Sequence, residues 1–300
     1  MSPNHASSEP ATASARAQPI GVFDSGIGGL TVVRALRDLL PNEKIYYLGD
    51  TARLPYGGKS AATVERYSVE ITAMLLQEHC KTVVVACNTA SALALPRLQK
   101  ISPVSVTGVI RPGAEAAMAA TRNGHIGIIG TRATIKSGAY ERALEAIEPG
   151  VRVTARACPL FVPLIEEGWL DGDITDGIVR QYLAPLVAEG IDTLVLGCTH
   201  YPLLREAIGR FLGPDVTLVD SAQNCARAVA QLLETEALCA EPGAEGKLHV
   251  ALTDPPDAFL EVALAALHLD IGTVQLRQVI HPAKEDMPND GRGAVEKLSS

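Results

Sequence analysis

The stretch Val83-Val84-Val85-Ala86-Cys87-Asn88-Thr89 runs from a short apolar segment into the start of a helical pattern. A second stretch, Leu194-Val195-Leu196-Gly197-Cys198-Thr199-His200, has the same layout. Short continuous apolar runs of this kind are typical of the buried strands of a parallel sheet. Side chains just past the carboxyl ends of such strands lie in the crevice where α/β folds bind ligands. We therefore expect Cys87 and Cys198 to face one pocket.

Two thiols in one pocket have a specific chemical use. A thiol whose pKa falls toward the working pH removes a proton as a thiolate and returns one as a thiol. Thr89 and Thr199 are placed to cap the helices that follow. The helix dipole at such an N-terminus lowers the pKa of a neighbouring thiol. Cys87 and Cys198 on opposite sides of one carbon atom could take a proton from one face and return it to the other.

Cysteines also occur as core residues, metal ligands, redox pairs and disulfides. Most free cysteines are core residues, and Cys80, Cys225 and Cys239 are assigned to the core. A closed zinc site needs four ligands, and the sequence has no Cys-x-x-Cys or His-x-x-x-His pair, so no metal site is predicted. A thiol oxidoreductase would need a resolving cysteine nearby. Structural disulfides are not expected, because no secretory signal is visible.

Strand and helix patterns alternate along most of the chain. Strands are predicted at 20–23, 45–48 and 82–86, with helices at 30–40 and 64–77 between them. Alternation at this spacing implies parallel strands joined by helical crossovers. The same scheme restarts after Pro112. We predict an α/β fold with two similar Rossmann-like lobes, mainly parallel sheets and an active site in the cleft between the lobes.

The predicted organisation has four parts. Residues 1–17, rich in Ser, Ala and Pro, are predicted to form a disordered tail. The first lobe is assigned to 18–111 together with 221–270, and the second lobe to 112–220. Residues 281–300 are predicted to be a second polar tail.

Charge and hydropathy restrict the partners. The net charge of −8 argues against nucleic acid and anionic membrane surfaces, which attract basic patches. No apolar stretch approaches the roughly 20 residues of a membrane span. The amino terminus lacks the apolar core of a signal peptide. A cytoplasmic protein with a small-molecule substrate is therefore expected, and a homodimer stays open.

A glycine-rich turn, Asp24-Ser25-Gly26-Ile27-Gly28-Gly29, follows the first strand. Together with Asp50 at the end of the second strand it resembles a dinucleotide-binding fingerprint. The third glycine position, however, holds Thr31, and a carboxylate at Asp24 would repel a pyrophosphate. The interpretation that we favour is a turn that presents Asp24 and Ser25 to the ammonium group of an amino acid, and no cofactor is predicted.

Three further segments carry candidate polar groups. The loop Leu54-Pro55-Tyr56-Gly57-Gly58-Lys59 follows the second strand and offers N–H groups to a carboxylate. His200 beside Cys198 could tune the thiol or relay its proton. Glu166 and Glu167 follow an apolar run, and from composition alone they are explained as helix-surface acids.

Five segments, in this order, resemble the bacterial glutamate racemases of the aspartate/glutamate racemase superfamily. They are Asp24-Ser25-Gly26-Ile27-Gly28-Gly29-Leu30, Leu54-Pro55-Tyr56-Gly57, Cys87-Asn88-Thr89-Ala90, the segment from Cys158 to Gly168, and Gly197-Cys198-Thr199-His200-Tyr201-Pro202. The resemblance spans roughly residues 18–270 and leaves the two tails outside.

The resemblance implies a cofactor-independent isomerase that interconverts L- and D-glutamate and supplies D-glutamate for peptidoglycan. It implies that Cys87 takes the α-proton of the D enantiomer and Cys198 that of the L enantiomer. Asp24 and His200 would assist Cys87 and Cys198 respectively, with Asp50 and Glu166 as auxiliary acids. The implied substrate contacts are Asp24, Ser25, Pro55, Tyr56, Gly57, Asn88, Thr89, Cys198, Thr199 and His200.

Two alternatives to this function remain at the level of sequence. One is aspartate racemase or a related amino-acid racemase, because the length of the substrate pocket cannot be derived from the sequence. The other is a non-catalytic binding or inhibitory protein with the same fold. The presence of both Cys87 and Cys198 argues against this second alternative.

Overall fold

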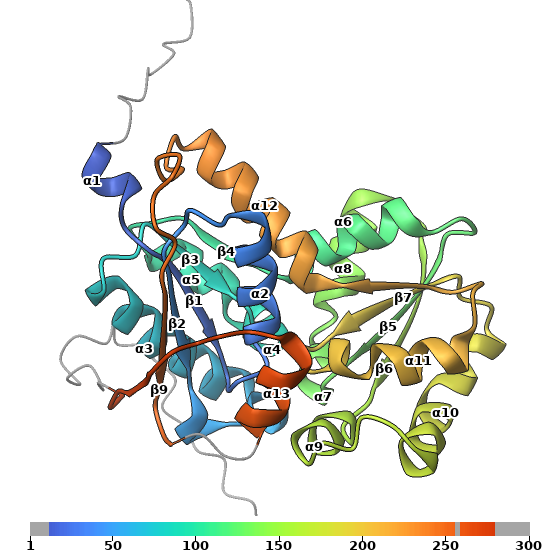
Figure 1. Cartoon of the computed structure of the whole chain (residues 1–300). Coiled ribbons are helices and arrows are strands. Elements are labelled where there is room, and N and C mark those ends of the chain that lie inside the picture. The colour runs from blue at the N-terminus through green and yellow to red at the C-terminus, as the bar shows by residue number, and fades with distance from the viewer. Residues whose placement is uncertain (1–11, 256–258, 280–300) are drawn as a thin grey trace, which may run out of the picture.

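The computed structural model describes residues 12–255 and 259–279. In these ranges the strands form two sheets in which every strand pairs in parallel with its neighbours. The first sheet has the order β10-β9-β2-β1-β3-β4 and the second β6-β5-β7-β8. Figure 1 shows the sheets in two lobes that lie next to each other. The predicted two-lobed α/β fold is confirmed.

The strands of the first sheet are β1 (Ile20–Asp24), β2 (Ile45–Gly49), β3 (Thr82–Val85), β4 (Val106–Gly108), β9 (Leu248–Leu252) and β10 (Val274–Leu276). Those of the second sheet are β5 (His125–Gly130), β6 (Arg152–Ala157), β7 (Thr193–Gly197) and β8 (Thr217–Asp220). The strands β1, β3, β5 and β7 are buried along their whole length. Burial on both faces explains why their sequences are continuous apolar runs rather than alternating patterns.

Helices cover both sheets. Around the first sheet lie α1 (Ala13–Arg16), α2 (Leu30–Leu39), α3 (Ala61–Gln77), α4 (Asn88–Leu93), α5 (Leu95–Ile101) and α13 (Phe259–Leu267). Around the second lie α7 (Arg132–Ser137), α8 (Ala139–Ile147), α9 (Phe161–Glu166), α10 (Asp173–Ala188) and α11 (Arg205–Leu212). Three short 3₁₀ helices are η1 (Thr51–Arg53), η2 (Tyr56–Gly58) and η3 (Tyr201–Leu204).

Two helices connect the lobes. α6 (Ile110–Ala120) leads from β4 to β5, and α12 (Ser221–Thr235) leads from β8 back to β9. The two helices pack against each other, as Figure 1 shows near the junction of the lobes. The predicted lobe boundary at Pro112 falls inside α6. The helix can include Pro112 because proline is tolerated in the first turn of a helix, where its missing N–H group needs no partner.

The amino-terminal segment differs from its prediction as a disordered tail in residues 12–17. Thr12 caps the short helix α1, and the buried ammonium group of Lys81 donates to the carbonyl oxygen of Arg16 at 2.8 Å. Lys81 also forms a buried ion pair with Glu43. A buried cation requires such acceptors, so they hold this segment against the first lobe. Residues 1–11 and the predicted tail at 281–300 lie outside the described residues.

Candidate active site

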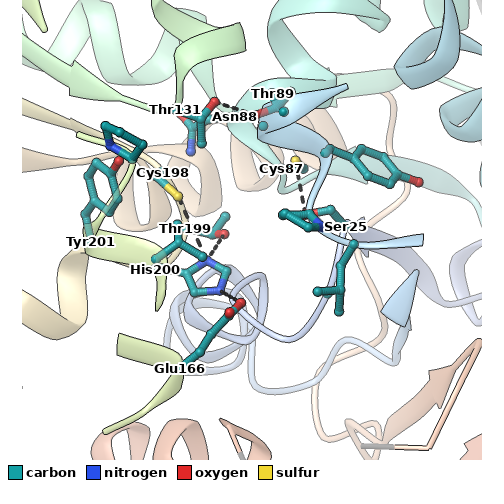
Figure 2. A pocket seen from close by; sticks show the side chains of 18 of the residues that line it. Ser25, Cys87, Asn88, Thr89, Thr131, Glu166, Cys198, Thr199, His200 and Tyr201 are labelled. Carbon is teal, nitrogen blue, oxygen red and sulfur yellow. Dashed lines mark hydrogen bonds and ion pairs between the residues drawn. The ribbon is translucent and has the colours of Figure 1, made fainter. Parts of the chain in front are cut away.

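A cavity of about 320 Å³ lies where the strands of the two sheets end, and its volume lies in the range of small-molecule sites. Its polar and reactive lining includes Ser25, Tyr56, Cys87, Asn88, Thr89, Thr131, Arg132, Glu166, Cys198, Thr199 and His200. Figure 2 shows Cys87 and Cys198 on opposite walls, with Ser25 beside the first and His200 beside the second. The strand-end cysteines of the two lobes therefore share one pocket.

Cys87 is the N-cap of α4 and lies two residues after the end of β3. Its Sγ accepts a hydrogen bond from the backbone N–H of Ala90 at 3.5 Å and lies 3.8 Å from Ser25 Oγ. Burial raises the pKa of the Cys87 thiol, and the negative charge of Asp24 raises that pKa further. Cys87 therefore keeps its proton at neutral pH, and the thiolate that it forms after losing the proton is a strong base.

Cys198 follows β7 and has a different partner. Nδ1 of His200 lies 3.9 Å from Cys198 Sγ, and Nε2 of the same ring lies 3.3 Å from Glu166 Oε1. Burial alone would lower the pKa of His200, but the hydrogen bonds with Cys198 and Glu166 outweigh it and raise this pKa to about 10. The ring is therefore an imidazolium at neutral pH, and its positive charge lies next to the Cys198 sulfur.

Glu166 belongs to this arrangement. Composition alone explained it as a surface acid, whereas the structure places it in the pocket lining at the carboxyl end of α9 (Figure 2). Its neighbour Glu167 is exposed and is not part of the lining. Glu166, His200 and Cys198 form a chain from carboxylate to imidazole to sulfur. Such a chain fixes the orientation and the charge of the imidazole.

Asp24 lies behind the pocket lining. Its carboxylate is fully buried, accepts the backbone N–H of Gly29 at 2.9 Å and lies 3.5 Å from Thr199 Oγ1. Ser25 lines the cavity and Asp24 does not, and the expected contact of Asp24 with the substrate ammonium stays a prediction. The carboxylate acts on Cys87 through its charge.

Asp50 also lies outside the cavity lining, fully buried. One carboxylate oxygen accepts Thr253 Oγ1 at 2.9 Å, and the other accepts Arg53 Nε at 2.7 Å and the hydroxyl of Tyr56. These bonds hold Tyr56 and the loop that carries it. Both carboxylate oxygens of Asp50 therefore have protein donors, and its expected role as an auxiliary acid stays a prediction.

The loop residues Pro55, Tyr56 and Gly57 line the cavity as expected. This loop crosses to the second lobe, since a Cβ atom built on Gly57 would lie 2.7 Å from the Cβ of Thr131. No real side chain fits at such a distance, so glycine allows the close approach. The loop of the first lobe therefore contacts the second lobe at the edge of the cavity.

Asn88, Thr89 and Thr199 line the cavity, but the two threonines do not cap helices as expected. Cys87 is the cap of α4, which places Thr89 in the first turn, and the short η3 begins only at Tyr201. Thr199 Oγ1 instead lies 3.4 Å from His200 Nδ1, and Thr89 Oγ1 lies 2.9 Å from Thr131 Oγ1. The hydroxyls connect the walls of the pocket.

Two lining residues were missed by the sequence analysis. Thr131 follows Gly130 at the end of β5 and caps α7 by accepting the N–H of Thr134 at 3.2 Å. Its place directly after an apolar run is the signal that could have found it. Arg132 is the only Arg or Lys in the cavity lining, as far as the described residues go. A guanidinium group in the lining is suited to bind an anionic group.

The described ranges contain no group of three His, Cys, Asp or Glu side chains arranged to hold a metal ion. Nor do they contain a helix long and apolar enough to span a membrane.

The family model for Asp/Glu/hydantoin racemases matches residues 30–229. The glutamate racemase of Geobacter metallireducens is 51% identical over 255 residues, which cover 85% of this chain and 94% of that protein. That of Neisseria meningitidis serogroup B is 54% identical over 224 residues, covering 74% and 83% respectively. The chain therefore belongs to the Asp/Glu/hydantoin racemase family.

Solved structures agree. The glutamate racemase RacE1 of Bacillus anthracis superposes with a TM-score of 0.84 at 40% identity, covering 88% of this chain and 98% of that one. That of Francisella tularensis, solved with D-glutamate, has a TM-score of 0.82 at 36% identity, covering 88% and 98%. An aspartate racemase homologue from Pyrococcus horikoshii is 19% identical and shares the fold alone. The relatives described above with at least 36% identity are all glutamate racemases, which confirms the resemblance found in the sequence.

The charge state of His200 can be tested directly. In the folded protein its pKa is raised from 6.5 to about 10, so the folded state keeps a proton that the unfolded state loses. The stabilisation is fully present below pH 6.5 and is lost as the pH rises through 10. We expect the NMR signals of the His200 ring to titrate near pH 10, and Glu166→Gln to lower this midpoint.

Glu167→Gln is the matched control, since it removes the same charge from the neighbouring exposed position. A midpoint that stays unchanged in Glu166→Gln, or that moves equally in both variants, would contradict the ion pair as the cause of the raised pKa.

Proposed function

We propose that this protein interconverts L- and D-glutamate by a two-base mechanism in which Cys198 and Cys87 act on opposite faces of the α-carbon. The observation that carries the proposal is the asymmetry of the two thiols in one cavity. Cys198 Sγ lies 3.9 Å from Nδ1 of the His200 imidazolium, whereas burial and the charge of Asp24 keep Cys87 protonated. For L-glutamate we assign the role of base to Cys198, beside His200, and the role of acid to the protonated Cys87.

For L-glutamate, the Cys198 thiolate removes the α-proton and the Cys87 thiol donates its proton to the other face. The products are D-glutamate, a Cys198 thiol and a Cys87 thiolate. The reverse reaction starts from this second state, in which Cys87 is the base. The raised pKa of Cys87 matches its thiolate to a very weak carbon acid.

Three features of the cavity support binding of an amino acid with two carboxylates. Asn88 presents a buried Nδ2 that has no hydrogen-bond partner in the described part of the protein. Arg132 supplies a positive charge to the lining, and Thr89, Thr131 and Thr199 supply hydroxyls. Donors fixed before the reaction stabilise the negative charge that develops on the substrate in the transition state.

The proposed reaction needs no pyridoxal phosphate. That cofactor is held as a Schiff base by a lysine, and the cavity lining contains no lysine among the described residues. The two sulfur bases and the fixed donors would carry the reaction instead. A supply of D-glutamate for peptidoglycan is the corresponding physiological role.

The test is exchange of the α-hydrogen in heavy water without added cofactor. We expect each enantiomer of glutamate to lose its α-proton signal in the NMR spectrum while the optical rotation decays to zero. Aspartate, offered at the same concentration, should react far more slowly. An enzyme that leaves glutamate unchanged, or that prefers aspartate, would overturn the proposal.

A further inference from the structure

The buried side chain of Tyr140, on α8 of the second lobe, lies between the two cysteine-bearing strand ends. Its hydroxyl donates to Asn88 Oδ1 at 2.7 Å, and Asn88 directly follows Cys87. A Cβ atom built on Gly197 would lie 3.2 Å from Tyr140 Cε2, and Gly197 directly precedes Cys198. The Tyr140 side chain therefore contacts the residue after Cys87 and the residue before Cys198. Tyr140 itself is not part of the cavity lining.

The same side chain contacts both connections between the lobes. A Cβ atom built on Gly113 in α6 would lie 3.4 Å from the Cε1 and hydroxyl oxygen of Tyr140. Ser221, the first residue of α12, forms a hydrogen bond with the Tyr140 hydroxyl. Tyr140 thus lies at the junction of the lobes, and in the primary structure it is distant from all four of these partners.

The hydrogen bonds define the orientation of the Asn88 amide. Burial raises the pKa of Tyr140, so its hydroxyl keeps the proton, and Ser221 is a donor to its oxygen. The Tyr140 proton then goes to Asn88 Oδ1, which leaves Nδ2 on the other side of the amide. Asn88 lines the cavity, and its Nδ2 is buried with no partner among the described residues. The amide N–H group is available to an acceptor on the substrate.

We propose that Tyr140 is a positioning residue for racemisation, which holds the Asn88 amide with Nδ2 toward a substrate carboxylate and fixes this amide relative to the Cys198 strand end. The proposal rests on the proposed glutamate racemase function and adds a residue that does not touch the substrate. Without the hydroxyl, the amide can turn over and present its oxygen to the carboxylate. Such a contact is repulsive, so substrate binding is weakened.

The test compares steady-state kinetics of Tyr140→Phe, Asn88→Ala and the double variant in both directions. Tyr140→Phe should raise KM for both enantiomers about tenfold, the effect of roughly one lost hydrogen bond, with kcat changed less than about threefold. The double variant should be no worse than Asn88→Ala alone, because Tyr140 acts through Asn88. Additive effects, or a loss confined to kcat, would overturn the proposal.

Tyr182→Phe is the matched control. The Tyr182 hydroxyl accepts a hydrogen bond from the backbone N–H of Leu160 at 3.3 Å, and Tyr182, like Tyr140, is not part of the cavity lining. We expect this variant to keep the KM of the unmodified protein. A rise in KM as large as that of Tyr140→Phe would assign the effect to general loss of packing and would refute the specific role.

Ser221→Ala carries the test if Tyr140→Phe fails to fold. This change removes the donor to the Tyr140 hydroxyl, so the amide orientation is less strictly defined, and KM should rise about two- to threefold. An unchanged KM would count against the proposal. Activity of the unmodified protein on glutamate tests the proposed function separately, because only the variants test Tyr140.

Discussion

Substitution of either Cys87 or Cys198 by serine is expected to abolish racemisation, with a fall in kcat of at least about 10³-fold. A serine hydroxyl is a far weaker acid than a thiol, so at neutral pH it neither forms the base nor gives up the proton. The side chain keeps nearly the same shape. Glutamate should therefore still bind, which calorimetry or a fluorescence titration would measure.

The remaining thiol distinguishes the two variants. In heavy water, Cys198→Ser retains the Cys87 side of the pocket and should exchange the α-hydrogen of D-glutamate slowly without inverting it. Cys87→Ser should do the same with L-glutamate. Cys239→Ser is the control, because Cys239 is not part of the cavity lining. Near-normal turnover by either active-site variant would refute the two-base mechanism.

Asp24→Asn and His200→Asn are expected to slow the reaction by about 10²-fold or more, the usual contribution of a proton-transfer partner. His200→Asn removes the positive charge next to Cys198, so removal of the proton from L-glutamate becomes harder. Asp24→Asn removes the charge that raises the pKa of Cys87, so the Cys87 thiolate becomes a weaker base toward D-glutamate. Each variant should therefore affect mainly one proton-removal step.

Primary isotope effects with α-deuterated L- and D-glutamate measure these steps separately. We expect the isotope effect to increase for L-glutamate in His200→Asn and for D-glutamate in Asp24→Asn. The equilibrium constant between enantiomers is unity, so the ratio of kcat/KM in the two directions cannot change. His249→Asn, an exposed position, is the control. Equal changes of both isotope effects in both variants would contradict the assignment of partners.

The fold class could be predicted because its signals are local. Continuous apolar runs mark the buried parallel strands, and the predicted strand at 20–23 is β1 with one further residue, Asp24. Helix boundaries were less accurate. The helix predicted at 64–77 begins at Ala61, since the side chain of Ser60 accepts the N–H of Thr63. A single polar residue defines that boundary, and hydropathy does not detect it.

The chain by itself determined that Cys87 and Cys198 follow buried strands. In a parallel sheet, such positions lie at the edge where ligands bind, so each thiol could be placed at the crevice of its own lobe. The two thiols follow strands of different sheets, so the packing of the lobes decides that they share one cavity. The chemistry of a thiol pair could then be derived from residue type alone. The local sequence also placed Ser25 and the loop from Pro55 to Gly57 near the same edge.

Only the tertiary structure decided which groups act on these thiols. It brings Glu166 of α9 to His200, moves Asp24 and Asp50 behind the cavity lining, and places Tyr140 between the two strand ends. These relations depend on how helices pack across the junction of two lobes, and no periodicity along the chain encodes a distance between segments so far apart. Burial and the charge of Asp24 then raise the pKa of Cys87, whereas Cys198 has the imidazole of His200 beside it.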